Sequence, residues 1–258
     1  MNCLIFGASG LIGSHLKTLL CQAYNVVTVG RQQEDTFPLD LERDWLSEGL
    51  PRDINSVIYL AQSEKFRDFP DSAESMFRVN SHSLLKALEY ARQVGAHTFI
   101  YASSGGVYDG RGSSFNEFSE ESPVYPYGEL GFYYSTKICG EMIARSYTPY
   151  MKIVILRPFF VYGPGQRKDM LIPKLVEKVR NSQSIHIAGE EGLYLNPIYV
   201  EDAARAIHKA LTINTSEIVN IAGSEILSMR KIGEEIGQAL CKEVRFEQAT
   251  GPSVKLVG

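Results

Sequence analysis

The sequence predicts an α/β fold built on a doubly wound parallel sheet, and three observations support this class. Short apolar stretches alternate with stretches of helical spacing along the first 158 residues. Three glycines, at positions 7, 10 and 13, follow the first apolar stretch directly. The chain has 258 residues, 44% of them hydrophobic and 22% charged, which is enough for one large domain with a smaller lobe.

The stretch 3–13 has the pattern of a strand, a tight turn and the start of a helix. Gly7 would permit the tight turn, Gly10 would let the backbone approach a phosphate, and Gly13 would let the helix pack closely on the strand. Amide groups at a helix N-terminus bind a pyrophosphate well. The stretch therefore predicts a dinucleotide cofactor, with a plain glycine-rich turn as the alternative.

The remaining elements follow from the apolar pattern, and right-handed crossovers would connect the strands of the sheet. Strands are expected at 3–6, 26–29, 56–61, 98–102 and 153–156, and helices at 11–21, 41–48, 72–94 and 133–147. After a turn-rich segment at 159–165, a smaller α/β lobe is expected beside the carboxyl edge of the sheet. Its predicted elements are helices at 170–179, 201–211 and 228–240 and strands at 184–187, 197–199 and 217–221.

The end of the second strand bears on the choice of cofactor. A carboxylate there accepts a hydrogen bond from the adenosine ribose of NAD, and it would repel the 2′-phosphate of NADP. Gly30 and Arg31 stand at this place. Because a guanidinium binds a phosphate bidentately, Arg31 favours NADP(H) over NAD(H). The alternative is that Arg31 is an ordinary solvated arginine.

The composition argues against several classes of function. A net charge of −4 favours neither nucleic acid nor an anionic membrane as a partner. No apolar stretch approaches the roughly 18 residues that span a bilayer, and the first strand follows Met1 too closely for a signal peptide. The four cysteines are scattered, without the spacing of a metal site or a disulfide framework. A soluble, cytoplasmic protein without a metal is expected.

Two clusters carry groups for acid–base chemistry. Ser104 follows the strand at 98–102, whereas Tyr133 and Lys137 are four residues apart on a helix and project from one face. A nearby ammonium and the positive charge of an oxidised nicotinamide would lower the pKa of the tyrosine from about 10 and make it a general base. Ser104 would orient the reacting hydroxyl or carbonyl. The alternative for Tyr133 and Lys137 is an amphipathic surface pair.

The order of these motifs resembles the extended short-chain dehydrogenase/reductase family, in its NAD-dependent epimerase/dehydratase group. The likeness extends over nearly the whole chain, through residues 7–13, 57–61, 79–80, 103–108, 133–137 with Glu141, 156–166 and 197–202. It implies a Rossmann-like, NAD(P)-binding domain at 1–158 and an interleaved substrate-binding lobe at 159–258. It also implies a nucleoside-diphosphate sugar as substrate and a homodimer formed through the helices at 72–94 and 133–147.

The resemblance further assigns roles to residues. Ser104, Tyr133 and Lys137 would be the catalytic set, with Lys137 also holding the nicotinamide ribose. Together with Arg31, the expected cofactor-binding residues are Gly7, Ser9, Gly10, Leu11, Ile12 and Gly13 at the pyrophosphate, Asp40 and Leu41 near the adenine, and Leu60, Ala61, Asn80, Tyr133, Lys137 and Phe159 towards the nicotinamide.

Departures from the family pattern narrow the reaction. The dehydratase branch carries an Asp–Glu pair where this chain has Gly105 and Gly106, and a branch that epimerises at C3 and C5 carries a cysteine in place of Gly106. Dehydration is therefore not expected. Hydride transfer at C4 of the sugar remains, either as a 4-epimerase or as a 4-keto reductase, and Gly106 would leave space for the sugar ring. Arg31 favours the reductase.

Two further functions stay open. Phe160 and Leu195 are apolar where many family members contact the nucleotide sugar, which favours an NADPH-dependent ketoreductase acting on a carbonyl compound without a nucleotide. A non-catalytic dinucleotide sensor is the alternative from another class. The complete set of Ser104, Tyr133 and Lys137 argues against the sensor.

Overall fold

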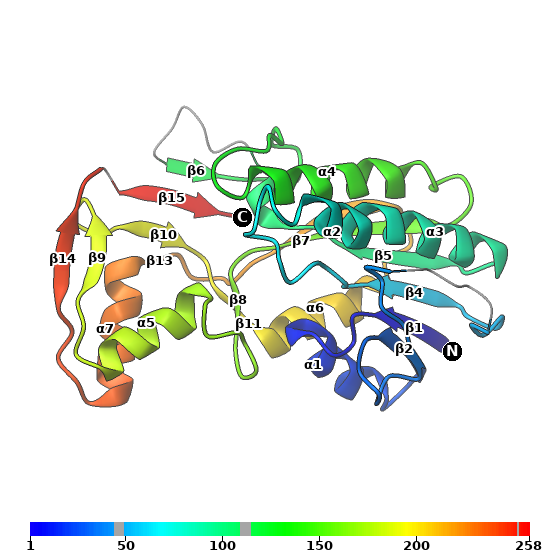
Figure 1. Ribbon diagram of the computed structural model, residues 1–258, viewed down its shortest axis with the longest axis horizontal. Helices are drawn as coiled ribbons and strands as arrows, with labels where there is room; N and C mark the ends of the chain where they lie inside the picture. Colours follow the sequence, from blue (N-terminus) through cyan, green and yellow to red (C-terminus); the bar gives the residue numbers. More distant parts are fainter. Residues whose placement is uncertain (44–48, 109–114, 252) are drawn as a thin grey trace.

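A seven-stranded parallel sheet forms the centre of the computed structural model, which describes residues 1–43, 49–108, 115–251 and 253–258 (Figure 1). The strand order in these residues is β12-β7-β5-β4-β1-β2-β3. The order reverses at β1, so the crevice at the carboxyl ends of β1 and β4 is where such a sheet binds ligands. The strands are β1 (Asn2–Phe6), β2 (Asn25–Gly30), β3 (Phe37–Pro38), β4 (Ser56–Tyr59), β5 (Thr98–Ala102), β7 (Lys152–Pro158) and β12 (Glu217–Ile221).

Helices cover both faces of this sheet, because its central strands are apolar on both sides. All five residues of β5 are buried. One layer contains α2 (Ala73–Phe77), the π-helical turn η1 (Arg78–His82), α3 (Ser83–Gln93) and α4 (Gly131–Arg145), and the other contains α1 (Leu11–Leu20) and α6 (Val200–Ala210) (Figure 1). Within the described ranges, no helix combines the length and the apolar character needed to cross a bilayer.

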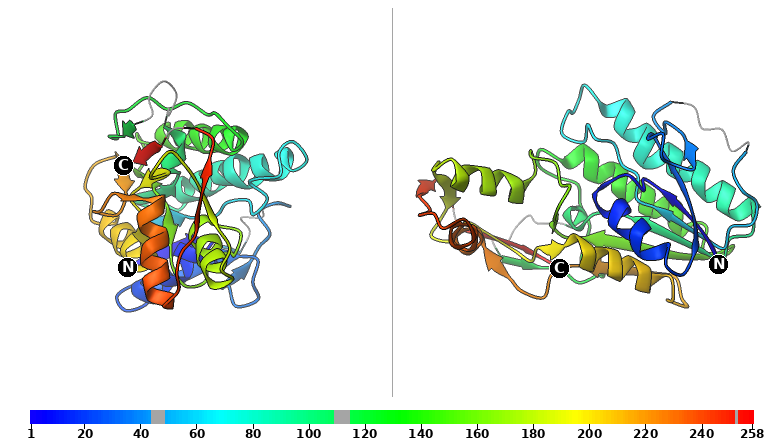
Figure 2. Two further views of the ribbon diagram at one scale, coloured as in Figure 1. Left: turned by 90° about the vertical axis from the view of Figure 1, so that its left-hand side faces the viewer. Right: turned by 90° about the horizontal axis from the view of Figure 1, so that it is seen from below.

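A smaller lobe extends the molecule beyond the carboxyl edge of the sheet (Figure 2). A four-stranded sheet of order β13-β10-β15-β6 and the pair β14-β9 make up its strands, and α5 and α7 share an apolar core with them. The elements of this part are β6 (Phe115–Glu117), α5 (Leu171–Arg180), β9 (Ile185–Ala188), β10 (Leu193–Leu195), β13 (Leu227–Ser228), α7 (Met229–Leu240), β14 (Phe246–Ala249) and β15 (Val254–Val257). The short parallel pair β8 (Val161–Tyr162) and β11 (Ile198–Tyr199) lies between the two parts.

Most elements expected in the first 158 residues are present, with ends that differ by at most two residues. The long helix expected at 72–94 is interrupted by the π-helical turn η1. The short helix expected at 41–48 falls mostly on 44–48, which lies outside the described residues. The strands β3, β6, β8, β10, β13, β14 and β15 were not expected, because they are short or have mixed burial that the alternation of apolar residues does not reveal.

Two elements expected in the smaller lobe belong to the larger domain. β12 pairs with β7 at the edge of the seven-stranded sheet. α6 packs beside α1, and its buried Ala203, Ala204 and Ile207 join the apolar cluster under that face of the sheet. The sequence predicted the helix and the strand themselves, but the apolar pattern does not identify the element on which each of them packs. This placement corrects the expectation.

Close packing of α1 on the first strand depends on Gly13. A Cβ at this position would lie 2.8 Å from the Cα of Ala8 and closer still to the carbonyl oxygen of Gly7. Backbone would have to move, so Gly13→Ala should lower the free energy of unfolding by about 1–3 kcal/mol in urea denaturation. Gly131→Ala is the matched control, because its Cβ would meet nothing nearer than 3.9 Å. A loss for Gly13→Ala no larger than for the control would contradict the packing argument.

Candidate active site

The glycine turn after β1 forms a cradle of backbone atoms. Gly7 has a φ of +81°, and its N–H donates to the carbonyl of Val29 over 3.0 Å. A Cβ on Gly7 would lie 2.8 Å from the backbone nitrogen of Ala61, so the turn sits directly against the end of β4. No side chain caps the first turn of α1. Its free N–H groups fit the pyrophosphate of a dinucleotide cofactor.

The other residues expected at this cradle surround it. Ser9 and Gly10 are exposed at the tip of the turn. Leu11 and Ile12 start α1 and are half-buried, as is Leu60 after β4. The structure thus brings the predicted pyrophosphate-binding residues together at the carboxyl ends of β1 and β4.

The residues expected near the adenosine gather after β2. The guanidinium of Arg31 forms an ion pair with Glu64 over 2.5 Å, and its side chain is half-exposed. Asp40 accepts a hydrogen bond from the N–H of Glu42 over 3.1 Å, and Leu41 is buried. The role of Arg31 towards a 2′-phosphate stays a prediction, and the structure gives its guanidinium a carboxylate partner.

Tyr133 reaches the crevice from α4. Its hydroxyl donates to Oε1 of Gln62 over 3.0 Å, and the side chain of Ser104 lies close enough to lower its pKa. Its ring is buried and packs on Phe66, with centroids 5.4 Å apart. Burial is the main cause that raises the pKa of Tyr133 above its usual value, the neighbouring Tyr134 adds to it, and the Ser104 contact lowers it. The expectation that Lys137 and an oxidised nicotinamide together lower the pKa of Tyr133 stays a prediction.

Lys137 lies one helical turn further along α4 and is almost fully buried. Its Nζ donates to the carbonyl of Ala102, at the end of β5, over 2.9 Å and lies 5.8 Å from the ring centroid of Tyr133. Burial lowers the pKa of Lys137 to about 7, against the opposing effect of Glu141. The backbone thus holds the Nζ of Lys137 beside the tyrosine ring.

Asn80, expected near the nicotinamide, is fully buried in η1. Its Oδ1 accepts from the N–H of Ser63 over 3.0 Å, and its Nδ2 donates to Oγ1 of Thr136 over 2.9 Å. Asn80 therefore connects the segment after β4 to the helix turn that carries Lys137. The structure gives it this positioning contact, and its contact with a cofactor stays a prediction.

A buried ion pair holds α4 against the sheet. Arg157 of β7 donates twice to the carboxylate of Glu141, over 3.0 and 2.6 Å, and both side chains are almost fully buried. The hydroxyl of Ser103, next to Ser104, donates to the same carboxylate over 2.5 Å. Because Glu141 follows Lys137 by four residues, the pair fixes the face of α4 that carries the catalytic candidates.

Aromatic rings fill the space at the two glycines after Ser104. A Cβ on Gly105 would lie 2.6 Å from the ring of Phe159, and a Cβ on Gly106 would lie 2.5 Å from Cζ and the hydroxyl oxygen of Tyr134. The expectation that Gly106 leaves space for a sugar ring is therefore wrong, because the Tyr134 ring occupies that space. Phe159 is buried and stacks on Tyr108, with centroids 6.0 Å apart.

The segment 62–70, called here the bridging segment, is linked by ion pairs to the residue after β2 and to the segment before α5. Its Arg67 forms an ion pair with Asp169 over 3.4 Å. Arg167 pairs with the same aspartate over 2.9 Å and donates to the carbonyl of Glu64 over 2.8 Å. Through the Arg31 pair, Glu64 also reaches the end of β2. The bridging segment thus connects the adenosine side of the crevice to the start of the smaller lobe.

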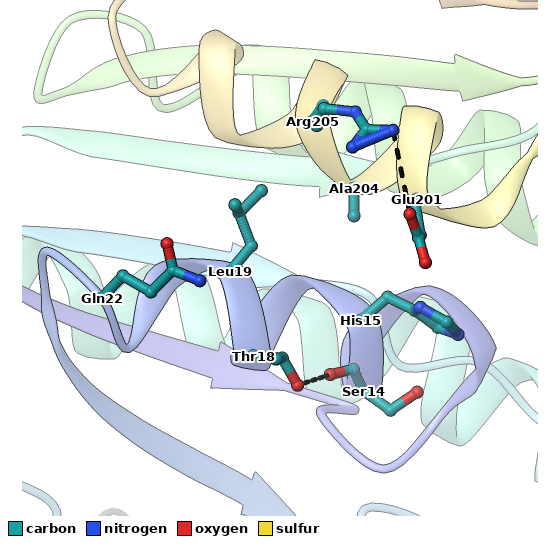
Figure 3. Close-up of a pocket in the computed structure, with 8 residues that line it drawn as sticks. All are labelled: Ser14, His15, Thr18, Leu19, Gln22, Glu201, Ala204 and Arg205. Atoms are coloured by element: carbon teal, nitrogen blue, oxygen red, sulfur yellow. Dashed lines mark hydrogen bonds and ion pairs between the residues drawn. The ribbon is translucent and has the colours of Figure 1, made fainter.

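A surface pocket of about 380 Å³ lies elsewhere, between α1 and α6 (Figure 3). The Ser14, His15 and Arg205 side chains are among those that line it, and Figure 3 shows Arg205 paired with Glu201. None of the predicted catalytic or cofactor-binding residues lines this pocket. The candidate active site is therefore the crevice at the carboxyl edge of the sheet.

Sequence reasoning missed two residues of this crevice. Gln62 accepts the hydrogen bond of the Tyr133 hydroxyl, and Tyr134 covers Gly106. Tyr134 lacks a lysine four residues later, so the spacing that marks Tyr133 does not mark it. The position of Gln62, directly after a strand that ends beside the glycine turn, was the available signal for a polar side chain at the site.

The fold and the site together define an enzyme of the extended short-chain dehydrogenase/reductase type that uses an NAD(P) cofactor. The chain belongs to the NAD-dependent epimerase/dehydratase family, whose family model matches residues 3–222. The family and fold expected from the sequence are thereby confirmed.

Individual relatives are nucleotide-sugar enzymes. The chain is 28% identical over 259 residues to the uncharacterized UDP-glucose epimerase YtcB of Bacillus subtilis (strain 168), covering 90% of this chain and 80% of that protein. It is 33% identical over 173 residues to dTDP-D-glucose 4,6-dehydratase of Mus musculus, covering 66% of this chain but 46% of that protein. The structure of UDP-glucuronic acid 4-epimerase from Bacillus cereus in complex with NAD has a TM-score of 0.84 and 26% identity, covering 100% of this chain and 87% of the other.

The buried Lys137 should make the stability of the fold depend on pH. Since its pKa of about 7 lies below the ordinary value of 10.5, the unfolded chain binds more protons than the folded chain between these values. The folded state therefore gains stability as pH rises through this window. Urea unfolding from about pH 7 to about pH 10 should show the wild type gaining about 1 kcal/mol per pH unit relative to Lys137→Met. The exposed Lys86→Met retains Lys137 and should keep the pH dependence of the wild type. A Lys137→Met variant whose stability changes with pH as the wild type's does would contradict the expected shift.

Proposed function

We propose that this enzyme transfers hydride at C4 of a nucleoside-diphosphate sugar, as a 4-epimerase. One observation carries the proposal: the Tyr133 hydroxyl and the Ser104 side chain lie together at the end of β5, while Gly105 and Gly106 carry no side-chain carboxylate. The rings of Phe159 and Tyr134 cover these glycines. The site therefore offers one proton-transfer group for one carbinol carbon and no carboxylate at the position from which the dehydratase branch eliminates water.

Three residues of the chain would transfer and orient the proton of the C4 hydroxyl. Tyr133 takes the proton of the C4 hydroxyl when the carbon is oxidised and returns it when the ketone is reduced. Ser104 donates to the same oxygen and orients it. Lys137 supplies a positive charge beside the tyrosine, which favours its phenolate. A bound NAD would supply the hydride acceptor and donor, with its pyrophosphate held by the Gly7–Gly13 cradle and its nicotinamide ribose held by Lys137.

A specific contact favours the epimerase over the reductase. The argument for a reductase rests on Arg31 binding the 2′-phosphate of NADPH. That guanidinium is paired with Glu64, so binding a phosphate would require breaking an ion pair of 2.5 Å. A tightly held NAD that is reduced and reoxidised in each turnover suits a site without this phosphate contact.

Removing the Tyr133 hydroxyl tests the catalytic role. Tyr133→Phe should lower kcat by about 10²–10⁴-fold, with NAD affinity within about threefold of wild type, because only the proton transfer is lost. Turnover would be followed by separating UDP-glucose, UDP-glucuronic acid and dTDP-glucose from their C4 epimers. Tyr150→Phe is the matched control at an exposed position. Undiminished turnover by Tyr133→Phe would exclude the assignment, and a wild-type product lighter by one water would exclude epimerisation in favour of dehydration.

We further propose a homodimer formed through the layer of α2, α3 and α4. This layer has large exposed apolar side chains, among them Phe77, Leu85 and Met142, on the outer surface of the domain. Apolar groups of this size on neighbouring helices are typical of a surface that a second copy covers.

Charged substitutions test this interface. Leu85→Lys combined with Met142→Lys should convert a dimer into a monomer of 28.8 kDa in size-exclusion chromatography with light scattering, because burying two ammonium groups is unfavourable. Ile226→Lys, at another exposed apolar position, should leave the dimer intact. A monomeric wild type would contradict the proposal.

A further inference from the structure

A carboxylate lies where a side chain at the end of β2 would project. Gly30 is the last residue of β2, and a Cβ built on it would lie 3.0 Å from Cγ of Asp35 and closer still to its Oδ2. The Gly7 turn is next to it, since the N–H of Gly7 donates to the carbonyl of Val29. Asp35, five residues further along the chain, thus fills the place of the missing side chain.

The loop that brings Asp35 there is fixed by hydrogen bonds. The N–H of Gln32 donates to Oδ2 of Asp35 over 3.1 Å, and the N–H of Asp35 donates to the carbonyl of Gln32 over 3.2 Å. Thr36 and Thr28 bond each other twice, with N–H to Oγ1 distances of 2.9 and 3.2 Å. The carboxylate is therefore held in position before any ligand arrives.

Asp35 is a nearly buried carboxylate without a cationic partner among the described residues. Its residue is 6% exposed, and among the described residues no Lys, Arg or His forms an ion pair with it. The neighbouring cations are each matched by another carboxylate, in the pairs Arg31–Glu64, Lys65–Glu42 and Arg43–Asp40. A carboxylate has about four acceptor positions, and one backbone N–H leaves most of them for a ligand.

We propose that Asp35 accepts hydrogen bonds from the adenosine ribose hydroxyls of the cofactor and makes the enzyme selective for NAD over NADP. A ribose diol supplies two O–H donors to a carboxylate that lacks a cation. A 2′-phosphate would instead bring like charge against a nearly buried carboxylate, with Arg31 already engaged by Glu64. This inference rests on the NAD(P) cofactor and not on the identity of the sugar, and it replaces the preference for NADP(H) drawn from Arg31.

Calorimetric titration with NAD and with NADP tests the role of Asp35. Wild type should bind NAD at least about tenfold more tightly than NADP, and Asp35→Asn should lose about tenfold in NAD affinity while NADP affinity stays equal or improves. Glu34→Gln, a neighbouring acid on the exposed side of the loop, is the matched control and should keep the wild-type ratio. Thermal unfolding without ligand would establish that each variant is folded.

A second variant keeps the test independent of damage to the loop. Gly30→Asp combined with Asp35→Gly moves the carboxylate back onto the strand end and should restore selectivity for NAD to within about threefold of wild type. Three results would overturn the inference: a wild type that prefers NADP, an unchanged ratio in folded Asp35→Asn, or a ratio that responds to Arg31→Ala instead. Because the readout is binding, failure to epimerise a nucleotide sugar would count against the proposed function alone.

Discussion

The buried ion pair between Glu141 and Arg157 is the contact on which the geometry of the site depends. It joins α4 to β7, and the hydroxyl of Ser103 extends it to β5. Such pairs contribute little net stability, because removing both charges from water costs about as much as their attraction returns. Removing one partner is expensive, however, since the other charge is left buried. The pair therefore chiefly fixes the rotation of α4 about its axis. In this orientation Tyr133 and Lys137 face the carboxyl ends of the strands.

Glycine and aromatic residues determine the shape of the site beside α4. Close approach at Gly7 and Gly13 brings α1 and β4 around a cradle of backbone N–H groups. At Gly105 and Gly106 the missing side chains are replaced by the rings of Phe159 and Tyr134. The first pair of glycines lets backbone segments pack closely around the cradle, whereas the second pair is covered by the aromatic rings. One part of the site thus presents backbone N–H groups, and the other presents aromatic rings beside Tyr133 and Ser104.

Much of this could be predicted from the sequence, because the relevant signals are local. Buried strands read as apolar stretches, the glycine spacing marks the turn, and a four-residue interval places Tyr133 and Lys137 on one face. Partners brought by distant loops could not be predicted. The Ala102 carbonyl that holds Lys137, the ring that covers Gly106, and the carboxylate that reaches Gly30 depend on chain paths without periodic pattern. The packing partners of α6 and β12 could not be predicted either, because an apolar face can pack on more than one surface.

The bridging segment has a consequence for how the two parts of the molecule respond to ionic strength. Its links to β2 and to the start of the smaller lobe are exposed ion pairs, with side chains about 39–64% accessible. Counter-ions at physiological concentration weaken such pairs, because the Debye length is about 8 Å. The Glu141–Arg157 pair lies beyond the reach of these ions. Added salt should therefore weaken the link between β2 and the smaller lobe, while α4, which carries Tyr133 and Lys137, keeps its orientation. The relative movement of the two parts of the molecule should depend on ionic strength, whereas the geometry of proton transfer should not.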